Sequence, residues 1–214
     1  FVDANGNAYE GIDAGDTSTF NFSTSEIEAP SPDDLKGGFR DDLIRGGSQG
    51  DHIRGRLGDD ILSGGGGDDR IFAGWGDDFV LGGDGDDRLF GSLGRDDLSG
   101  GQGDDALRGG WGKDTLSGGA GDDDMRGGWG TDTFIFDGGH DTIYDFDTGF
   151  EFWFLSRPTE TLVFDIDCLD SFETLIETAS QAGRDVVFDV GDQDSLTLRD
   201  VQLSHLDADV FDFV

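Results

Sequence analysis

The sequence predicts an all-β solenoid, a stack of short strands joined by tight glycine-rich turns, with a small mixed α/β cap at its C-terminal end. Two observations predict this fold. Glycine is concentrated rather than scattered, because 32 of the 38 glycines lie between Gly37 and Tyr144. The same stretch divides into twelve consecutive copies of nine residues, without insertion or deletion. A short fixed period of this kind is typical of repeat architectures.

The composition of the 214 residues excludes several classes of protein. The 48 acidic and 14 basic residues give a net charge of −34, which repels nucleic acid and anionic membrane surfaces. The single cysteine, Cys168, excludes an internal disulfide framework and a thiolate metal cluster. No apolar run approaches the roughly 18 residues that a membrane span needs. The chain begins with Phe1 rather than Met, so we expect a fragment of a longer protein.

Three positions of the nine-residue repeat carry the pattern. The eighth position is apolar in all twelve copies, and the fourth is glycine in ten, failing only at Arg40 and Gln49. The sixth position is aspartate in all twelve copies. These aspartates are Asp42, Asp51, Asp60, Asp69, Asp78, Asp87, Asp96, Asp105, Asp114, Asp123, Asp132 and Asp141.

Each regularity has a physical cause. Side chains alternate across a strand, so one inward apolar residue flanked by two outward residues predicts a three-residue strand. The remaining six residues form a turn, in which glycines reach positive φ and expose their carbonyls. Two copies then make one coil of eighteen residues, with a strand on each side and a turn at each edge. Aspartates two copies apart therefore stack at a strand spacing of about 4.8 Å.

Carboxylates stacked this closely repel one another unless a cation lies between them. Carboxylate and carbonyl oxygens, without thiolates or an ordered set of histidines, suit calcium rather than zinc or copper. Six turns at each edge leave five gaps, so at most ten ions fit, and with degenerate end copies we expect about eight. The carbonyls that we expect to join the aspartates belong to turn residues such as Gly58, Gly67, Gly76, Gly85, Gly94, Gly103, Gly112 and Gly121.

The best copies are "GGGGDDRIF" (64–72), "GGDGDDRLF" (82–90) and "GGQGDDALR" (100–108). They resemble the RTX, or haemolysin-type, calcium-binding nonapeptide GGxGxDxUx, where U is apolar. The resemblance implies an all-β, right-handed parallel β-roll with calcium in its turns. It also implies a protein that is exported unfolded by a type I secretion system.

The resemblance weakens at both ends of the repeat block. Arg40, Gln49, Phe136 and Asp137 replace consensus residues, which puts the outermost ions in doubt. Residues 132–156 resemble the segment that closes RTX modules in serralysin-type proteases and alginate epimerases. In this segment Gly149, Glu151 and Trp153 have the spacing of positions four, six and eight of the repeat, although they match the consensus less closely.

These observations divide the chain into three parts. Residues 1–36 are polar and predict a linker or the end of an upstream domain, with at most one strand at 19–23. Residues 37–154 are predicted to form the roll. Residues 155–214 are predicted to form the cap and to end in a type I secretion signal, because they resemble the uncleaved C-terminal signals of RTX proteins. The alternative for the residues that match that signal, 209–214, is one more edge strand.

Within the cap, the pattern predicts one helix and two strands. Phe172, Leu175, Ile176 and Ala179 fall on one helical face. Asp170 and Glu173 have the spacing of a capping box, and Gly183 ends the helix. The two strands are expected at 185–190 and 195–201. We expect residues 145–201 to cover the open end of the roll.

The sequence contains no recognisable arrangement of catalytic residues, so we expect any catalytic domain to lie upstream. The three histidines, His52, His140 and His205, are scattered, and acidic neighbours of Cys168 oppose a reactive thiolate. The primary hypothesis is a secreted, extracellular or cell-surface module that folds on calcium and supports the export and folding of an attached domain. Its partners are then calcium and the type I secretion machinery. A disordered acidic linker is the competing interpretation, but a pattern held in phase over twelve copies argues against it where calcium is present.

The alternative hypothesis is a module that binds a polysaccharide or a partner domain. Copy parity places five arginines on one sheet and only Arg45 on the other, although arginines on an exposed sheet also favour solubility. The five are Arg54, Arg70, Arg88, Arg108 and Arg126. A partner surface is predicted at one edge, where the third positions of odd copies are large and apolar. They are Phe39, Leu57, Trp75, Leu93, Trp111 and Trp129, and they either dock a partner or simply shield the turns.

Overall fold

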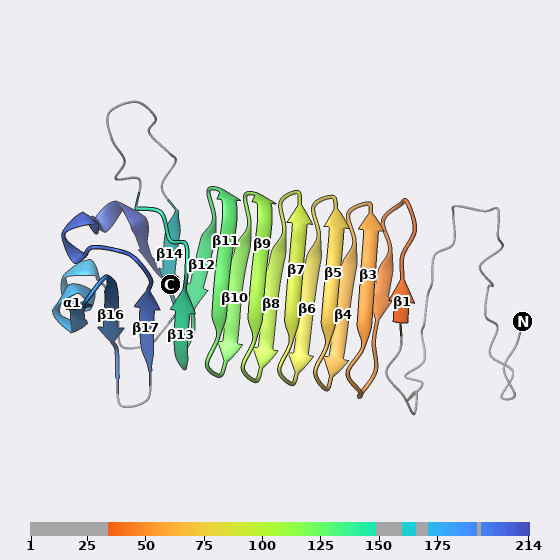
Figure 1. The fold of residues 1–214 in the computed structure, drawn as a ribbon, viewed down its shortest axis with the longest axis horizontal. Coiled ribbons are helices and arrows are strands. Elements are labelled where there is room, and N and C mark those ends of the chain that lie inside the picture. Colours follow the sequence, from red (N-terminus) through yellow and green to blue (C-terminus); the bar gives the residue numbers. More distant parts are fainter. Residues whose placement is uncertain (1–33, 149–159, 166–170, 192–193) are drawn as a thin grey trace, which may run out of the picture.

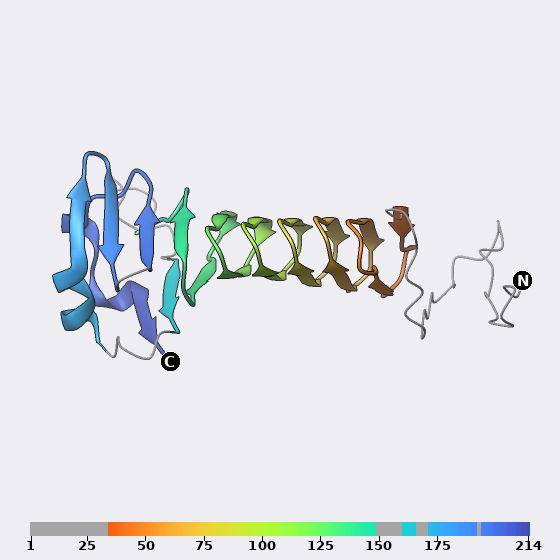
Figure 2. The ribbon, with the colours of Figure 1, turned by 90° about the horizontal axis from the view of Figure 1, so that it is seen from below.

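The computed structural model describes residues 34–148, 160–165, 171–191 and 194–214. It is an elongated parallel β-solenoid whose two sheets face each other, with a mixed cap at the C-terminal end (Figures 1 and 2). One sheet contains, in order, β1 (Asp34–Lys36), β3 (His52–Leu57), β5 (Arg70–Trp75), β7 (Arg88–Leu93), β9 (Ala106–Gly112), β11 (Asp124–Gly130), β13 (His140–Ile143), β17 (Ser195–Leu198), β16 (Asp185–Asp189) and β15 (Ala179–Ala182). The other contains β2 (Leu43–Arg45), β4 (Ile61–Gly66), β6 (Phe79–Asp84), β8 (Asp97–Gln102), β10 (Thr115–Ala120), β12 (Thr133–Phe136), β14 (Thr161–Phe164) and β18 (Phe211–Phe213).

The eighteen-residue coil is confirmed by the register of the strands. In parallel pairing Ile71 of β5 lies beside Leu89 of β7, and Val80 of β6 lies beside Leu98 of β8. The prediction of three-residue strands was wrong for most of the roll, because pairing continues through the first three positions of the next copy. Trp75 and Leu93, for example, are still in register.

The core of the roll is one apolar side chain deep on each sheet. Every eighth-position residue is buried, and those of β3 to β12 are fully shielded from solvent. The fourth-position glycine is required because coils approach closely there. Gly76 has φ +136°, and a Cβ on it would collide with the carbonyl oxygen of Gly58 in the preceding coil. Solenoid pairing begins before the predicted start at Gly37, since β1 pairs with β3 through Leu35 and Ile53.

The cap extends both sheets of the roll rather than packing across its end. Strand β17 adds to β13 and β14 adds to β12, all in parallel, whereas β15, β16 and β17 form an antiparallel meander. Phe136 replaces a first-position glycine because the core widens at this point. Its ring packs edge-on against Phe164, 5.6 Å between centroids.

The predicted helix is present but shorter than expected. Helix α1 (Phe172–Thr178) is capped by Ser171, whose hydroxyl accepts a hydrogen bond from the backbone N–H of Thr174. It ends before Gly183 because residues 179–182 form β15, which pairs with β16 around a turn in which Gly183 has φ +72°. The short 3₁₀ helices Leu203–His205 and Ala208–Val210 lead into β18.

Several other predictions, for the segments on either side of the repeats, can be compared with the structure. Strands expected at 185–190 and 195–201 correspond to β16 and β17. Residues 211–213 form an edge strand, β18, beside β14. Asp170 and the segments at 19–23 and 149–153 lie outside the described residues. Among the described residues, no helix is long and apolar enough to cross a membrane.

Candidate metal centre

The twelve sixth-position aspartates form two buried rows, one along each edge of the roll. All of them are at most 9 % exposed. Odd copies supply the row from Asp42 to Asp132, and even copies supply the row from Asp51 to Asp141. Within a row, each aspartate lies one coil from the next, as their strand registers require.

In ten of the twelve carboxylates, all but the first of each row, one oxygen accepts a hydrogen bond from the preceding coil. The Oδ1 atom of Asp60 accepts a hydrogen bond from the backbone N–H of Asp42, at 2.8 Å. The same bond recurs coil after coil, for instance from the N–H of Asp96 to Oδ1 of Asp114 at 2.9 Å. This bond fixes the side chain towards the preceding coil and explains why aspartate, with its short side chain, occupies the position.

The other oxygen is the conspicuous feature of the site. Ten Oδ2 atoms, those of Asp60 through Asp141 in the two rows, are buried and have no hydrogen-bond partner. Only at the N-terminal end is this oxygen satisfied by protein, because Gly38 N–H donates to Asp42 and Gly47 N–H donates to Asp51. A buried, unpaired carboxylate oxygen is costly, so each requires a proton or a cation.

Burial raises the pKa of these carboxyls well above the ordinary value of 3.8. Hydrogen bonds from the preceding coil partly offset this effect, and nearby aspartates add to it in most cases. The pKa rises to about 6 for Asp78, Asp87 and Asp123, to about 7 for Asp60, Asp69, Asp96, Asp105 and Asp114, and to about 8 for Asp141.

Two rows of backbone carbonyls border the same gaps. A Cβ built on Gly109 would lie 2.7 Å from the carbonyl oxygen of Gly127 and closer still to Oδ2 of Asp114. First-position carbonyls, which sequence reasoning missed, therefore lie beside the free oxygens. Fourth-position carbonyls, which it named, also border the gap, since a Cβ on Gly112 would meet both Gly94 O and Asp114 Oδ1. One of these, Gly121 O, accepts a hydrogen bond from His140 N–H at 3.3 Å.

This donor set fits calcium. Among the described residues, no three histidine, cysteine, aspartate or glutamate side chains converge on one point. Each gap instead combines two carboxylates with backbone carbonyls, the hard oxygen donors that calcium takes in a flexible arrangement.

Comparison with known proteins agrees with this geometry. The family description "RTX calcium-binding nonapeptide repeat (4 copies)" matches residues 31–62, 45–80, 72–107, 81–116 and 108–143, which together span more than half of the chain. The chain belongs to the RTX calcium-binding nonapeptide repeat family. RTX repeats bind calcium, and the parallel solenoid is the expected β-roll.

No curated protein matches the sequence. A similar solved structure is that of the extracellular lipase LipA from Serratia marcescens, with 22% sequence identity and a TM-score of 0.41. The similarity covers 87% of this chain and 41% of the lipase, so the chain spans less than half the length of that protein.

The RTX turns also contain a second carboxylate ladder, which sequence reasoning missed. Fifth-position aspartates are exposed and bond in the opposite direction, because Oδ1 of Asp41 accepts from the N–H of Asp59 at 2.9 Å. The ladder continues from Asp59 to Asp77, and then to the N–H of Arg95. The two adjacent aspartates at positions five and six, in copies such as "GGDGDDRLF", were the feature of the sequence that could have predicted this second ladder. These side chains tie adjacent turns together from outside.

The large apolar third-position residues of the odd copies lie along one edge of the RTX roll. Strand register joins Leu57 to Trp75, Trp75 to Leu93, Leu93 to Trp111 and Trp111 to Trp129. Phe39 and the three tryptophans of this edge are each at least 60% exposed. Trp111 and Trp129 stack at 5.4 Å between centroids.

The arginines on the sheet that contains β3 to β11 also lie as predicted, with Arg45 on the other sheet. Most of their guanidinium groups lie over aromatic rings. Arg70 lies 5.0 Å from the centroid of Phe72 and Arg126 lies 3.8 Å from that of Tyr144. Cation–π contacts of this kind stabilise the sheet face.

Proposed function

We propose that this RTX module folds when calcium enters its turns, outside the cell, and so supports the export and folding of a domain attached to it. The observation that carries the proposal is the set of ten buried Oδ2 atoms without a partner. Eight gaps lie between two such aspartates, and the first gap of each row has only one. We therefore propose about eight ions at full occupancy.

The physical basis is the balance of charge. A chain with net charge −34 must place twelve carboxylates in buried rows when the roll forms. Without cations their mutual repulsion and desolvation oppose folding. Calcium is scarce in the cytosol and abundant outside, and a ligand that binds only the folded state stabilises it by mass action. The chain then stays loose before export and folds afterwards, with any catalytic activity residing in another domain.

A neighbouring pair of aspartates provides the test. Asp96 is a buried member of the ladder, whereas Asp97 is exposed at the start of β8. We expect Asp96→Asn to raise the calcium concentration at the midpoint of folding several-fold, and Asp97→Asn to leave it unchanged. Circular dichroism during calcium titration measures both. Equal midpoints for the two variants, or complete β structure in excess chelator at neutral pH, would contradict the proposal.

The exposed aromatic edge favours a second role, in binding a partner. It is a contiguous apolar strip that an isolated RTX roll leaves in solvent. Replacing Trp75, Trp111 and Trp129 with serine would leave calcium folding nearly intact and abolish an association seen by light scattering with the parent protein. A loss of calcium affinity without any change in molecular mass would show that the rings only brace the turns.

A further inference from the structure

The two aspartate rows end differently at the cap. Strand β14 pairs with β12 so that Thr161 lies beside Thr133 and Leu162 beside Phe134, which places Glu160 beside Asp132. On the other edge, β17 pairs with β13 so that Leu196 lies beside Asp141. One row therefore continues with a carboxylate, and the other ends at an apolar side chain.

Glu160 has the backbone environment of a sixth-position aspartate. The N–H that follows it, that of Thr161, donates to the carbonyl oxygen of Asp132 at 2.9 Å. Within the repeats the equivalent bond runs from Thr133 N–H to the carbonyl of Asp114, at 2.8 Å. Glu160 thus occupies the next rung of the ladder, although it lies 28 residues after Asp132 instead of 18. This longer interval hides it from any search for the nine-residue period.

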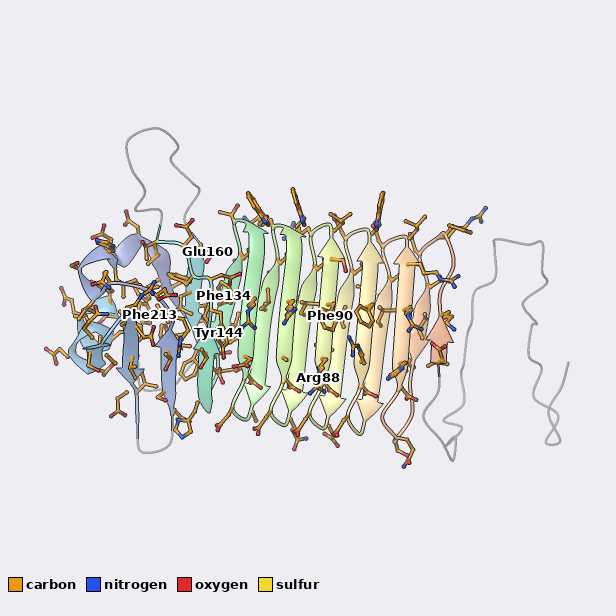
Figure 3. All side chains as sticks on the ribbon, in the orientation of Figure 1. Arg88, Phe90, Phe134, Tyr144, Glu160 and Phe213 are labelled. Atoms are coloured by element: carbon orange, nitrogen blue, oxygen red, sulfur yellow. The ribbon has the colours of Figure 1, made fainter. Side chains whose placement is uncertain are left out.

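Glu160 is also buried like a ladder aspartate. It is 2% exposed, and among the described residues every other buried acidic side chain is a sixth-position aspartate. One of its oxygens, Oε2, accepts a hydrogen bond from the N–H of Asp147 at 2.7 Å. Figure 3 shows Glu160 at the junction between roll and cap, on the edge that carries the aromatic rings. Burial raises its pKa to about 9, with further increases from Asp145, Asp132 and Asp147.

A second observation points into the same gap. The Oδ2 atom of Asp132, a residue 1% exposed, has no hydrogen-bond partner. In the repeats this oxygen faces the coil ahead, as the proximity of Asp114 Oδ2 to the Gly127 carbonyl shows. The coil ahead of Asp132 is the one that contains Glu160. Asp145, which accepts hydrogen bonds from Gly127 and Gly128 N–H at 3.0 Å, brings another carboxylate to this end.

We propose that Asp132 and Glu160 hold an additional hard divalent cation, of the calcium class, one coil beyond the last nonapeptide on this edge. The inference rests on the proposed calcium loading of the repeats. The ion would join strand β12 of the roll to strand β14 of the cap, so that filling of the ladder and ordering of the cap become one event. On the opposite edge the equivalent register position is Leu196, whose side chain has no oxygen to bind a cation.

The competing interpretation is that Glu160 is a neutral carboxylic acid that only accepts the Asp147 N–H bond. Glu160→Gln separates the two, because the amide oxygen keeps that bond and removes the charge. The matched control is Glu173→Gln, on the exposed side of α1. Calcium bound at saturation is counted for the full chain by equilibrium dialysis with atomic emission. We expect one ion fewer per chain in Glu160→Gln and no loss in Glu173→Gln. An unchanged count in Glu160→Gln would overturn the proposal.

A crystal structure of the calcium-loaded parent chain decides the matter even if Glu160→Gln does not fold. An anomalous difference peak between Asp132 and Glu160 is the expected result. Peaks in the repeat gaps without one at Glu160 would overturn this inference and leave the proposed function standing. An absence of peaks throughout the roll would instead contradict the proposed function itself.

Discussion

Ten of the twelve sixth-position aspartates, those from Asp60 to Asp141, are subject to two opposing influences on their charge. The amide of the preceding coil fixes Oδ1 and favours the charged form, while burial of Oδ2 disfavours it. The outcome is a raised pKa, and so a carboxyl that releases its proton readily only when a cation replaces it. This makes protons and calcium competitors for the same oxygens.

This competition predicts a pH dependence. The folded pKa values of about 6 to 8 lie above the ordinary value of 3.8, so protonation stabilises the calcium-free roll at acidic pH, and that stability is lost as pH rises through the folded pKa. As the pH falls from 8 to 5, we expect chelated protein to gain β structure and the calcium concentration at the midpoint of folding to fall, because protons then supply part of the stabilisation that calcium supplies at neutral pH. Circular dichroism at each pH measures both, and a midpoint independent of pH would refute the link.

Backbone strain at a second position of the repeat gives another prediction. Ser92 has φ +89°, at a position where seven of the twelve copies have glycine with positive φ. We expect Ser92→Gly to stabilise the calcium-loaded roll by about 1 kcal/mol, since a left-handed conformation costs a non-glycine residue roughly 1–2 kcal/mol. Ser99→Gly, in strand β8, is the control and should destabilise the roll. Thermal melts in saturating calcium compare them, and a lower melting temperature for Ser92→Gly would count against this account.

Among the elements, those fixed by short-range periodicity were predictable and those fixed by tertiary context were not. The invariant aspartate and apolar positions placed both rows and the core of the roll, because each copy repeats the same environment. Strand length was underestimated, since pairing past the bend depends on the neighbouring coil. The end of α1 was misplaced because pairing with β16 overrides the helical pattern up to Gly183. Glu160 was missed because its interval breaks the period.

A strand-level prediction follows from the thin core. Leu98 of β8 is fully buried, whereas Leu81 of β6 is 37% exposed on the outer face of the same sheet. We expect Leu98→Ala to destabilise the calcium-loaded roll by about 2–5 kcal/mol, because a solenoid one side chain deep cannot repack around the cavity. Leu81→Ala should cost less than about 1 kcal/mol. Denaturant unfolding in saturating calcium distinguishes them, and similar losses would argue against a single-layer core.

For the whole molecule, the important feature is that the sheets of the roll run on into the cap. Strands β14 and β17 cover edges that the last coils would otherwise expose, and the ring of Phe164 packs on that of Phe136. The cap therefore closes the C-terminal end of the solenoid, because its strands pair with the last strands of the roll and its side chains continue the hydrophobic core. It also supplies Glu160 at the end of one aspartate row.

Removing the cap should consequently weaken the calcium response of the roll. A chain that ends after Tyr144 loses β14 to β18, which leaves β12 and β13 as open edges. We expect it to need much more calcium to fold, and with lower cooperativity, in a titration followed by circular dichroism. A truncated chain whose titration superimposes on that of the full chain would show that the cap has no part in folding.

The claim that calcium folds the roll is tested most directly by the size of the full chain, measured by small-angle X-ray scattering at neutral pH. In excess chelator we predict an expanded chain, and after calcium addition a rigid elongated particle with the dimensions of the roll and cap. Removing the calcium again should restore the expanded state. A scattering curve that stays that of the elongated roll in chelator would contradict the account.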